Sequence, residues 1–177
     1  MDLGHAAFCV KTPRLRLEAP SLDEARALMR GERAALEARI GAAIPADWPH
    51  PDLMAGLPEI TAEMAGVADD TRFLWVIIEE ASARVIGDVG FHGVLRDGAA
   101  AEIGYQLEPD ARGHGYATEA AAALIAWTFA QTGVSEVTAR IEPSNARSLR
   151  VAAKLGMQPR PATSPGYLTF GTARPPT

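Results

Sequence analysis

The chain has 177 residues, of which 47% are hydrophobic, and its formal net charge is −5. This length suits a single domain, and the composition allows a substantial core to be buried. The sequence has no run of Lys and Arg, so binding to nucleic acid or to an anionic membrane has little support, and small molecules or protein surfaces are the expected partners.

Cysteine content and hydropathy favour a cytoplasmic protein. Cys9 is the only cysteine, which excludes an internal disulfide. No apolar run approaches the roughly 20 residues of a membrane span, and the first fourteen residues have neither the basic start nor the long apolar core of a secretion signal. We therefore expect a soluble protein in the cytoplasm.

The first half of the chain predicts one strand and three helices. Residues 15–20 alternate in hydropathy like a short strand. The helix that follows at 21–30 opens with a capping box made of Ser21 and Glu24. Two more helices are expected, around residues 32–40 and 57–65, on either side of the proline-rich sequence IPADWPHPDL.

The second half predicts an antiparallel meander followed by alternating helices and strands. Three strands joined by short turns are expected at 73–78, 85–94 and 101–107. The almost wholly apolar helix at 116–132 should be buried on most sides. A strand at 137–141, a helix ending at Gly156 and a strand at 167–171 complete the order. The inward residues of that last helix are expected to be Leu149, Ala152, Ala153 and Leu155.

This order of elements predicts a mixed α/β fold, also called α+β. The crossover from residue 102 to 141 joins two strands through a helix, so it should be parallel and right-handed. We expect one domain over residues 12–171, an N-terminal extension at 1–11 and a loose tail at 172–177.

The sequence ARGHGYATEA at residues 111–120 predicts an anion site. Glycine at 113 and 115 lets backbone N–H groups approach an anion, and the helix that begins near Tyr116 adds the partial positive charge of its N-terminus. A nucleotide P-loop is excluded because no lysine follows the glycines. A dinucleotide fingerprint is disfavoured because Thr118 stands at its third small position and the preceding strands are antiparallel. A plain left-handed turn before a buried helix is the alternative.

The pattern Arg112-x-x-Gly115-x-Ala117 resembles the Q/R-x-x-G-x-G/A pyrophosphate loop of the GNAT superfamily of acyl-CoA-dependent N-acyltransferases. The successive motifs AEIGYQL, PDARGHGYATEA and NARSLRVAAKLGM are also similar to that superfamily, and TPRLRLEAPSLDEARALM is similar to its branch of ribosomal-protein N-terminal acetyltransferases. The resemblance runs from Thr12 to Phe170. It implies a mostly antiparallel sheet, splayed at the cofactor site, with helices on both faces and acetyl-CoA as the cosubstrate.

The same resemblance implies a set of residues that contact coenzyme A, in the loop, the strand before it and the turn before the later helix. These residues are Tyr105, Gln106, Leu107, Arg112, Gly113, His114, Gly115, Tyr116, Ala117, Thr118 and Asn145. Asn145 is also suited to capping the helix that follows it. No metal is expected, because the four histidines show no ligand spacing with one another or with Cys9.

Acetyl transfer from a thioester to an amine needs a free amine, a site for the developing oxyanion and a proton for the departing thiolate. The resemblance implies Glu102 as the base, and His92 on the neighbouring strand is the alternative. Either side chain can instead be structural. The resemblance also implies a bulge in this strand, with which Gly104 is compatible, and a backbone N–H near Gly104 to Leu107 that faces the thioester.

The sequence departs from the superfamily at the position of the acid, because Ala152 stands where many members have a tyrosine. Ser148 occupies the place of a serine proposed to assist the thiolate in the ribosomal-protein branch, so the resemblance implies that role for it. Trp48 and His50 either wall the acceptor pocket or belong to a surface loop.

These observations predict an N-acetyltransferase in which a primary amine, on a protein N-terminus or a small molecule, attacks the thioester directly in a ternary complex. The alternative is a non-catalytic acyl-CoA-binding or sensing protein, which Ala152 would favour. A monomer and a homodimer are both compatible with the sequence.

Overall fold

A computed structural model of the chain describes residues 9–66, 73–92 and 98–176. Within these ranges eight strands form one sheet in the order β1-β2-β3-β4-β5-β6-β8-β7. The strands are β1 (Cys9–Lys11), β2 (Leu15–Glu18), β3 (Leu74–Glu79), β4 (Arg84–His92), β5 (Ala100–Leu107), β6 (Glu136–Ile141), β7 (Gln158–Arg160) and β8 (Leu168–Ala173). Among these described strands only β5 and β6 are parallel neighbours, so the predicted mixed, mostly antiparallel sheet is confirmed.

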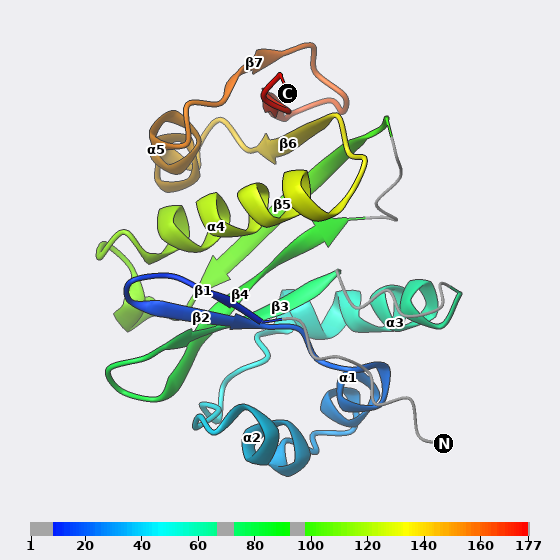
Figure 1. Cartoon of the computed structure of the whole chain (residues 1–177), viewed down its shortest axis with the longest axis vertical. Coiled ribbons are helices and arrows are strands. Elements are labelled where there is room, and N and C mark those ends of the chain that lie inside the picture. The colour runs from blue at the N-terminus through cyan, green and yellow to red at the C-terminus, as the bar shows by residue number, and fades with distance from the viewer. Residues whose placement is uncertain (1–8, 67–72, 93–97, 177) are drawn as a thin grey trace.

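Helices cover both faces of the sheet. They are α1 (Leu22–Met29), α2 (Ala34–Ile40), α3 (Pro51–Gly66), α4 (Tyr116–Gln131) and α5 (Ala146–Lys154). Figure 1 shows α4 lying across the middle of the molecule, with α1 and α2 gathered at one end and α5 beside the last strands at the other. None of the helices in the described ranges combines the length and apolarity that a membrane crossing requires.

Five residues of the apolar run FLWVII, from Leu74 to Ile78, lie in β3, which is buried on both faces because it separates two cores. Trp75 and Ile77 lie in the core under α4, where Leu124 is also fully buried. Val76 points the other way, into the core that α2 and α3 share. The rings of Trp75 and Trp127 meet edge to face, with centroids 5.0 Å apart. Alternate side chains of β3 thus pack against the helices on opposite faces of the sheet.

The sheet opens between β5 and β6. These strands pair at only three positions, the last joining Glu102 and Thr138. Beyond Glu102, β5 continues to Leu107 in register with β4, while β6 continues in register with β8. The predicted parallel crossover and the predicted splay are therefore confirmed, and the splay exposes one side of β5 at its C-terminal end.

The bulge expected at Gly104 is wrong. Gly104 pairs with Gly90 without a register shift, and the irregularity of the sheet lies between β3 and β4, near Ile77. Glycine suits position 104 for a different reason, because a Cβ there would lie 2.9 Å from Nε2 of His92. The position leaves room for that imidazole on the surface of the sheet.

Several element boundaries differ from the expected ones. The short strands β1 and β7 were not predicted, and β1 lies inside the expected N-terminal extension. Strand β8 extends to Ala173, and Arg174 Nε donates to the carbonyl of Val134 at 2.9 Å, so the start of the expected tail belongs to the sheet. Helix α3 begins at Pro51, because proline at the first helical position lacks only an N–H that would have no partner there. Ala153 is exposed rather than inward.

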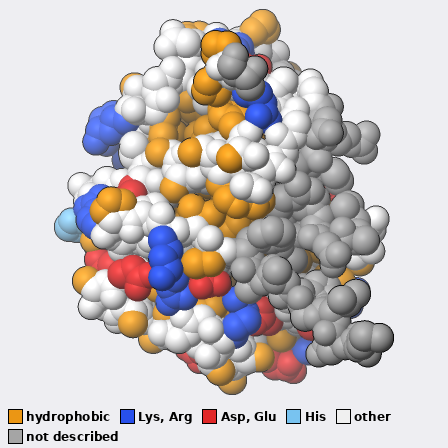
Figure 2. Space-filling view, in the orientation of Figure 1, with side chains coloured by type: hydrophobic (Ala, Val, Ile, Leu, Met, Phe, Trp, Pro, Cys, Tyr) orange, Lys and Arg blue, Asp and Glu red, His pale blue; other side chains and the backbone are white. Residues whose placement is uncertain are grey.

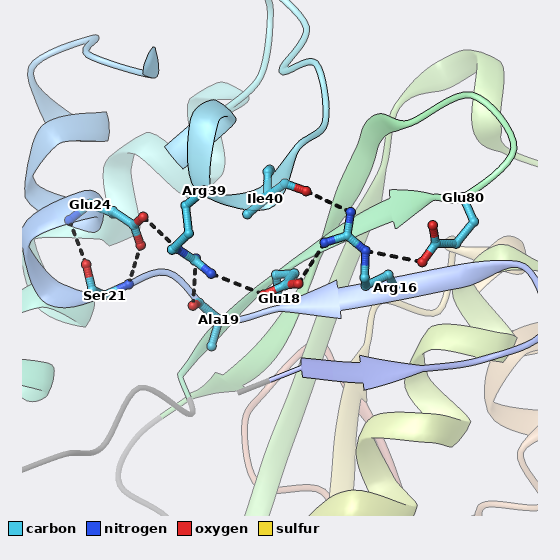
Figure 3. Close-up of polar contacts among 8 residues, drawn as sticks. All are labelled: Arg16, Glu18, Ala19, Ser21, Glu24, Arg39, Ile40 and Glu80. Carbon is cyan, nitrogen blue, oxygen red and sulfur yellow. Dashed lines mark hydrogen bonds and ion pairs between the residues drawn. The ribbon is translucent and has the colours of Figure 1, made fainter. Parts of the chain in front are cut away.

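Ion pairs fasten α1 and α2 to β2 (Figure 3). Arg39 binds Glu18 at 3.1 Å and Glu24 at 2.7 Å, while Arg16 binds the other oxygen of Glu18 at 2.7 Å. The predicted capping box of Ser21 and Glu24 is present. Burial raises the pKa of Glu24, but hydrogen bonds from Arg39 and Ser21 outweigh burial and lower it. Figure 2 shows acidic and basic side chains interspersed on the lower half of the molecule, in the orientation of Figure 1.

Candidate active site

The loop between β5 and α4 has the geometry of an anion cradle. Gly113 and Gly115 both have φ of +85°, in the left-handed region that favours glycine, and Gly115 is the N-cap of α4. A Cβ at Gly113 would meet no atom within 4 Å, so the space in front of the loop is open. The first N–H groups of a helix have no partner inside it, and here they adjoin this open space.

Arg14, which the sequence reading did not single out, holds the loop in place from the turn between β1 and β2. Its Nη1 donates to the carbonyl of His114 at 3.0 Å, and its Nε donates to Glu119 at 2.7 Å. Thr12 donates to the same carboxylate at 2.6 Å, and the guanidinium lies 4.5 Å from the ring centre of Tyr116. Burial raises the pKa of Glu119, but the hydrogen bonds from Thr12 and Arg14 outweigh burial and lower it.

A first cavity of about 420 Å³ lies between this loop, the end of β5 and α5. Its lining consists of Tyr105, Gln106, Leu107, Arg112, Gly113, Gly115, Tyr116, Ala117, Thr118, Asn145, Arg147, Ser148, Arg150, Val151 and Lys154. The structure thus brings together every residue that the sequence suggested for coenzyme A except His114, and it adds Ser148. Their role as ligands stays a prediction.

The first cavity is cationic. In the part of the chain that the structure describes, its lining holds Arg112, Arg147, Arg150 and Lys154 and no carboxylate. The Arg112 side chain turns back to donate from Nε to the carbonyl of Leu107 at 2.9 Å. The three cations of α5 were missed by the sequence reading, although their spacing of three, four and seven residues places them on one helix face.

Tyr105 and Ser148 meet across the first cavity from β5 and α5. Burial raises the pKa of the Tyr105 phenol, and a hydrogen bond with Ser148 opposes part of that effect. The phenol therefore keeps its proton at neutral pH. Ser148 lies in the first turn of α5, where its backbone N–H donates to Oδ1 of the N-cap Asn145 at 3.1 Å. Ala152 is buried on the inner side of the helix.

A second cavity of about 330 Å³ lies between α3 and strands β3 to β5. Its lining consists of His50, Asp52, Leu53, Gly56, Glu59, Ile60, Glu63, Phe73, Leu74, Asp88, Gly90, Phe91, His92, Gly104, Tyr105 and Gln106. Among the described residues this lining has four carboxylates and no Lys or Arg. Tyr105 and Gln106 line both cavities, so the two cavities adjoin each other at the end of β5.

The carboxylate of Asp88 forms hydrogen bonds with both Trp48 and His50 beside the second cavity. Trp48 Nε1 donates to Asp88 Oδ2 at 3.0 Å, and His50 Nε2 lies 3.0 Å from the same oxygen. The hydrogen bond to Asp88 raises the pKa of His50 in spite of its burial. His50 lines the cavity as one interpretation of the sequence expected, whereas Trp48 is fully buried and supports Asp88 from behind.

Glu102, the expected base, lines neither cavity, although its register partner His92 and Gly104, two residues further along β5, both line the second one. Its carboxylate pairs with Arg140 Nε at 2.7 Å. It stands four residues before Gln106 on β5, which is about 13 Å along a strand. His92 pairs with Glu102 across the strands and lines the second cavity. The catalytic role of Glu102 stays a prediction, with the two cavity histidines as competitors.

Across the described ranges, no group of three His, Cys, Asp or Glu side chains is placed to hold a metal ion. The family described as acetyltransferase (GNAT) domain matches residues 14–158, a span that contains the splayed strands, the glycine loop and both cavities. The chain belongs to the GNAT family and is an acetyltransferase, which confirms the family and enzyme class predicted from the sequence.

Individual relatives agree with this assignment. An uncharacterized N-acetyltransferase of Bacillus subtilis (strain 168), YjdG, is 29% identical over 150 residues, which cover 83% of this chain and 88% of that protein. The ribosomal-protein-S5-alanine acetyltransferase of Vibrio fischeri has a TM-score of 0.66 at 15% identity, over 94% of this chain and 97% of that one. RimJ of Mycobacterium smegmatis, solved in complex with CoA-disulfide, has a TM-score of 0.59 at 20% identity, over 94% and 86%. These two structures resemble the chain in fold.

Proposed function

We propose that the protein transfers the acetyl group of acetyl-CoA to a primary amine by direct attack in a ternary complex. The observation that carries the proposal is the opposite charge of two cavities that share Tyr105 and Gln106. Coenzyme A carries several phosphate charges and is complementary to the cationic cavity, while an ammonium group is complementary to the acidic one. The two substrates would then approach the end of β5 from opposite sides.

In the first cavity, Gly113, Gly115 and the N-terminus of α4 would hold the pyrophosphate. Arg147, Arg150 and Lys154 would hold further phosphate charge from α5. Acetyl-CoA supplies the activated acyl group. Ser148, which lines the first cavity together with Tyr105, is the proposed source of the proton for the departing thiolate, and a thiol with a pKa near 8.5 needs only modest help to leave.

The acceptor is a protein N-terminal amine or a small amine. The name of the Vibrio fischeri neighbour, a ribosomal-protein-S5-alanine acetyltransferase, supports a protein terminus. The 330 Å³ cavity also suits a small amine or the first residues of a peptide. Cytoplasmic location and the choice between monomer and homodimer stay predictions.

Calorimetric titration of acetyl-CoA and desulfo-CoA tests the cofactor half of the proposal. We expect micromolar binding to the parent and at least a tenfold loss in Arg150→Glu, because the reversed charge faces the phosphates. Arg26→Glu is the matched control, since Arg26 is an exposed residue of α1 and the change in net charge is the same. Equal losses in both variants would contradict a local phosphate site.

A panel of small primary amines and short peptides with free α-amino groups tests the acceptor half. Transfer is followed by release of free thiol and by the mass of the acetylated product. A parent protein that binds acetyl-CoA tightly and acetylates none of these amines would contradict the proposed reaction.

A further inference from the structure

We propose that His50, oriented by Asp88, accepts the proton of the acceptor amine in the second cavity. This assignment rests on the proposed function, because it needs an amine in that cavity. It names a catalytic residue that lies 38 positions from its carboxylate partner in the chain.

The hydrogen bonds of Asp88 fix the tautomer of the imidazole. An ionised carboxylate can only accept, so the 3.0 Å contact between Asp88 Oδ2 and His50 Nε2 requires the hydrogen to be on Nε2. Trp48 Nε1 donates to the same oxygen and holds the carboxylate in place. In the neutral ring, Nδ1 therefore carries the free lone pair.

Nδ1 of His50 is the atom that lacks a partner. In the described part of the chain it is the one buried side-chain nitrogen or oxygen without a hydrogen bond. Buried polar atoms are nearly always satisfied in folded proteins, so an exception calls for an explanation. Nδ1 itself has almost no solvent-accessible surface, so an amine in the cavity that His50 lines would supply the missing hydrogen bond once the imidazole turns toward it.

The position along the strands also favours this histidine. Asp88 is the register partner of Gln106, one of the two residues shared by both cavities. The pair of His50 and Asp88 is therefore next to the place where the two substrates would meet. Glu102 lies about 13 Å further along β5 and is occupied by Arg140.

The reaction balances with this assignment. The acceptor binds as an ammonium and loses its first proton through Nδ1 of His50 to solvent. As the nitrogen of the free amine bonds to the acetyl carbon and the C–S bond breaks, a second N–H proton passes to Nδ1 and the thiolate takes the proton of Ser148. The imidazolium then returns its proton to solvent, and solvent restores the proton of Ser148. In sum the ammonium loses two protons, the thiolate gains one and solvent gains one.

The charges around His50 determine the pH at which it can act. The titratable groups that share its cavity or act on it are Asp52, Glu59, Glu63, Asp88, His92, Tyr105 and Glu108. The hydrogen bond to Asp88 first, then the charges of Asp88, Glu108 and Asp52, raise the pKa of His50 above its usual value, against the effect of burial. The neutral base therefore forms at a higher pH than for an ordinary histidine.

The test is steady-state kinetics of the full chain with the best amine of the panel. His50→Gln should lower kcat by about 100-fold or more, the usual contribution of a general base. Its affinity for acetyl-CoA should stay within twofold of the parent, because the first cavity is on the other side of β5. Glu102→Gln, the rival base, should cost less than His50→Gln. A larger loss in Glu102→Gln, or an unchanged kcat in His50→Gln, would overturn the assignment.

The pH profile separates a base from a structural residue. The acidic limb of kcat/KM should lie above the ordinary histidine range, vanish in His50→Gln and move to lower pH in Asp88→Asn, which lacks the charge that raises the pKa. Asp110→Asn, an exposed carboxylate paired with Arg84, is the matched control and should leave the limb in place. An unmoved limb in Asp88→Asn contradicts the proposal.

The tautomer provides a readout that is independent of turnover. Nitrogen-15 NMR of neutral His50 should place the hydrogen on Nε2, and a hydrogen on Nδ1 would overturn the proposal. A parent that acetylates amines while His50→Gln remains fully active contradicts this inference alone. A parent that binds acetyl-CoA and acetylates nothing contradicts the proposed function.

Discussion

A single methyl group on the glycine loop tests whether it holds the pyrophosphate. Gly113 has φ of +85°, and the Cβ of Gly113→Ala would point into open space. An alanine in the left-handed region costs about 1–2 kcal/mol of stability. A chain of this length loses roughly 2–4 °C in Tm for each kcal/mol, so Tm should fall by about 2–8 °C.

Gly166→Ala is the control for that strain. Gly166 has φ of +81°, its Cβ would also meet no atom within 4 Å, and it lies between β7 and β8, outside the first cavity. Both variants should lose similar stability in thermal unfolding. Only Gly113→Ala should also lose acetyl-CoA binding, by at least tenfold in calorimetry, or about 1.4 kcal/mol. Equal affinity in the two variants would refute the reasoning that the backbone of the loop touches the cofactor.

Three further predictions concern the scaffold. Leu124→Ala removes a fully buried side chain of α4 and should cost about 2–5 kcal/mol in urea unfolding, whereas a loss below 1 kcal/mol would contradict its place in the core. Gly90→Ala should disrupt the pairing of β3 and β4 and lower the yield of folded protein, because its Cβ would overlap the carbonyl oxygen of Phe73; near-parental Tm would contradict this packing. The pKa of Glu119 is lower in the folded protein than its unfolded value near 4.5, so its ion pair with Arg14 adds to the free energy of unfolding above that pH and is lost as pH falls through the folded pKa. The loss of stability in Arg14→Ala should therefore shrink on acidification. A loss that is constant with pH would contradict this.

The elements with strong periodicity were predictable. The continuous apolar run around β3 and the alanine-rich α4 carry enough residues to define their type and place. Strands β1 and β7 have three residues each, too few for alternation to show. The start of α3 was hidden because Pro51 belongs to the proline-rich sequence IPADWPHPDL, which predicts an irregular segment, although this proline opens the helix.

The two cavities also differ in how far the sequence could predict them. The first cavity follows a local motif, since the glycines, the helix N-terminus and the end of β5 are close in sequence. The second cavity joins α3, β4 and β5, which no local pattern brings together. His50 and Asp88 are 38 residues apart, and Arg14 reaches Glu119 over 105 residues. Pairs so far apart depend on the sheet order, which the sequence alone did not supply.

The short ladder between β5 and β6 has a mechanical consequence. Strands β6, β7 and β8 with α5 are joined to the rest of the sheet mainly through three paired positions, the ion pair of Arg140 with Glu102 and the packing of α4. Coenzyme A bound in the first cavity would contact both sides of this junction and act as an additional brace. Because a ligand stabilises the state that binds it, the free energy of unfolding would rise with the concentration of acetyl-CoA. Starvation for acetyl-CoA would then shorten the lifetime of the enzyme as well as slow its reaction.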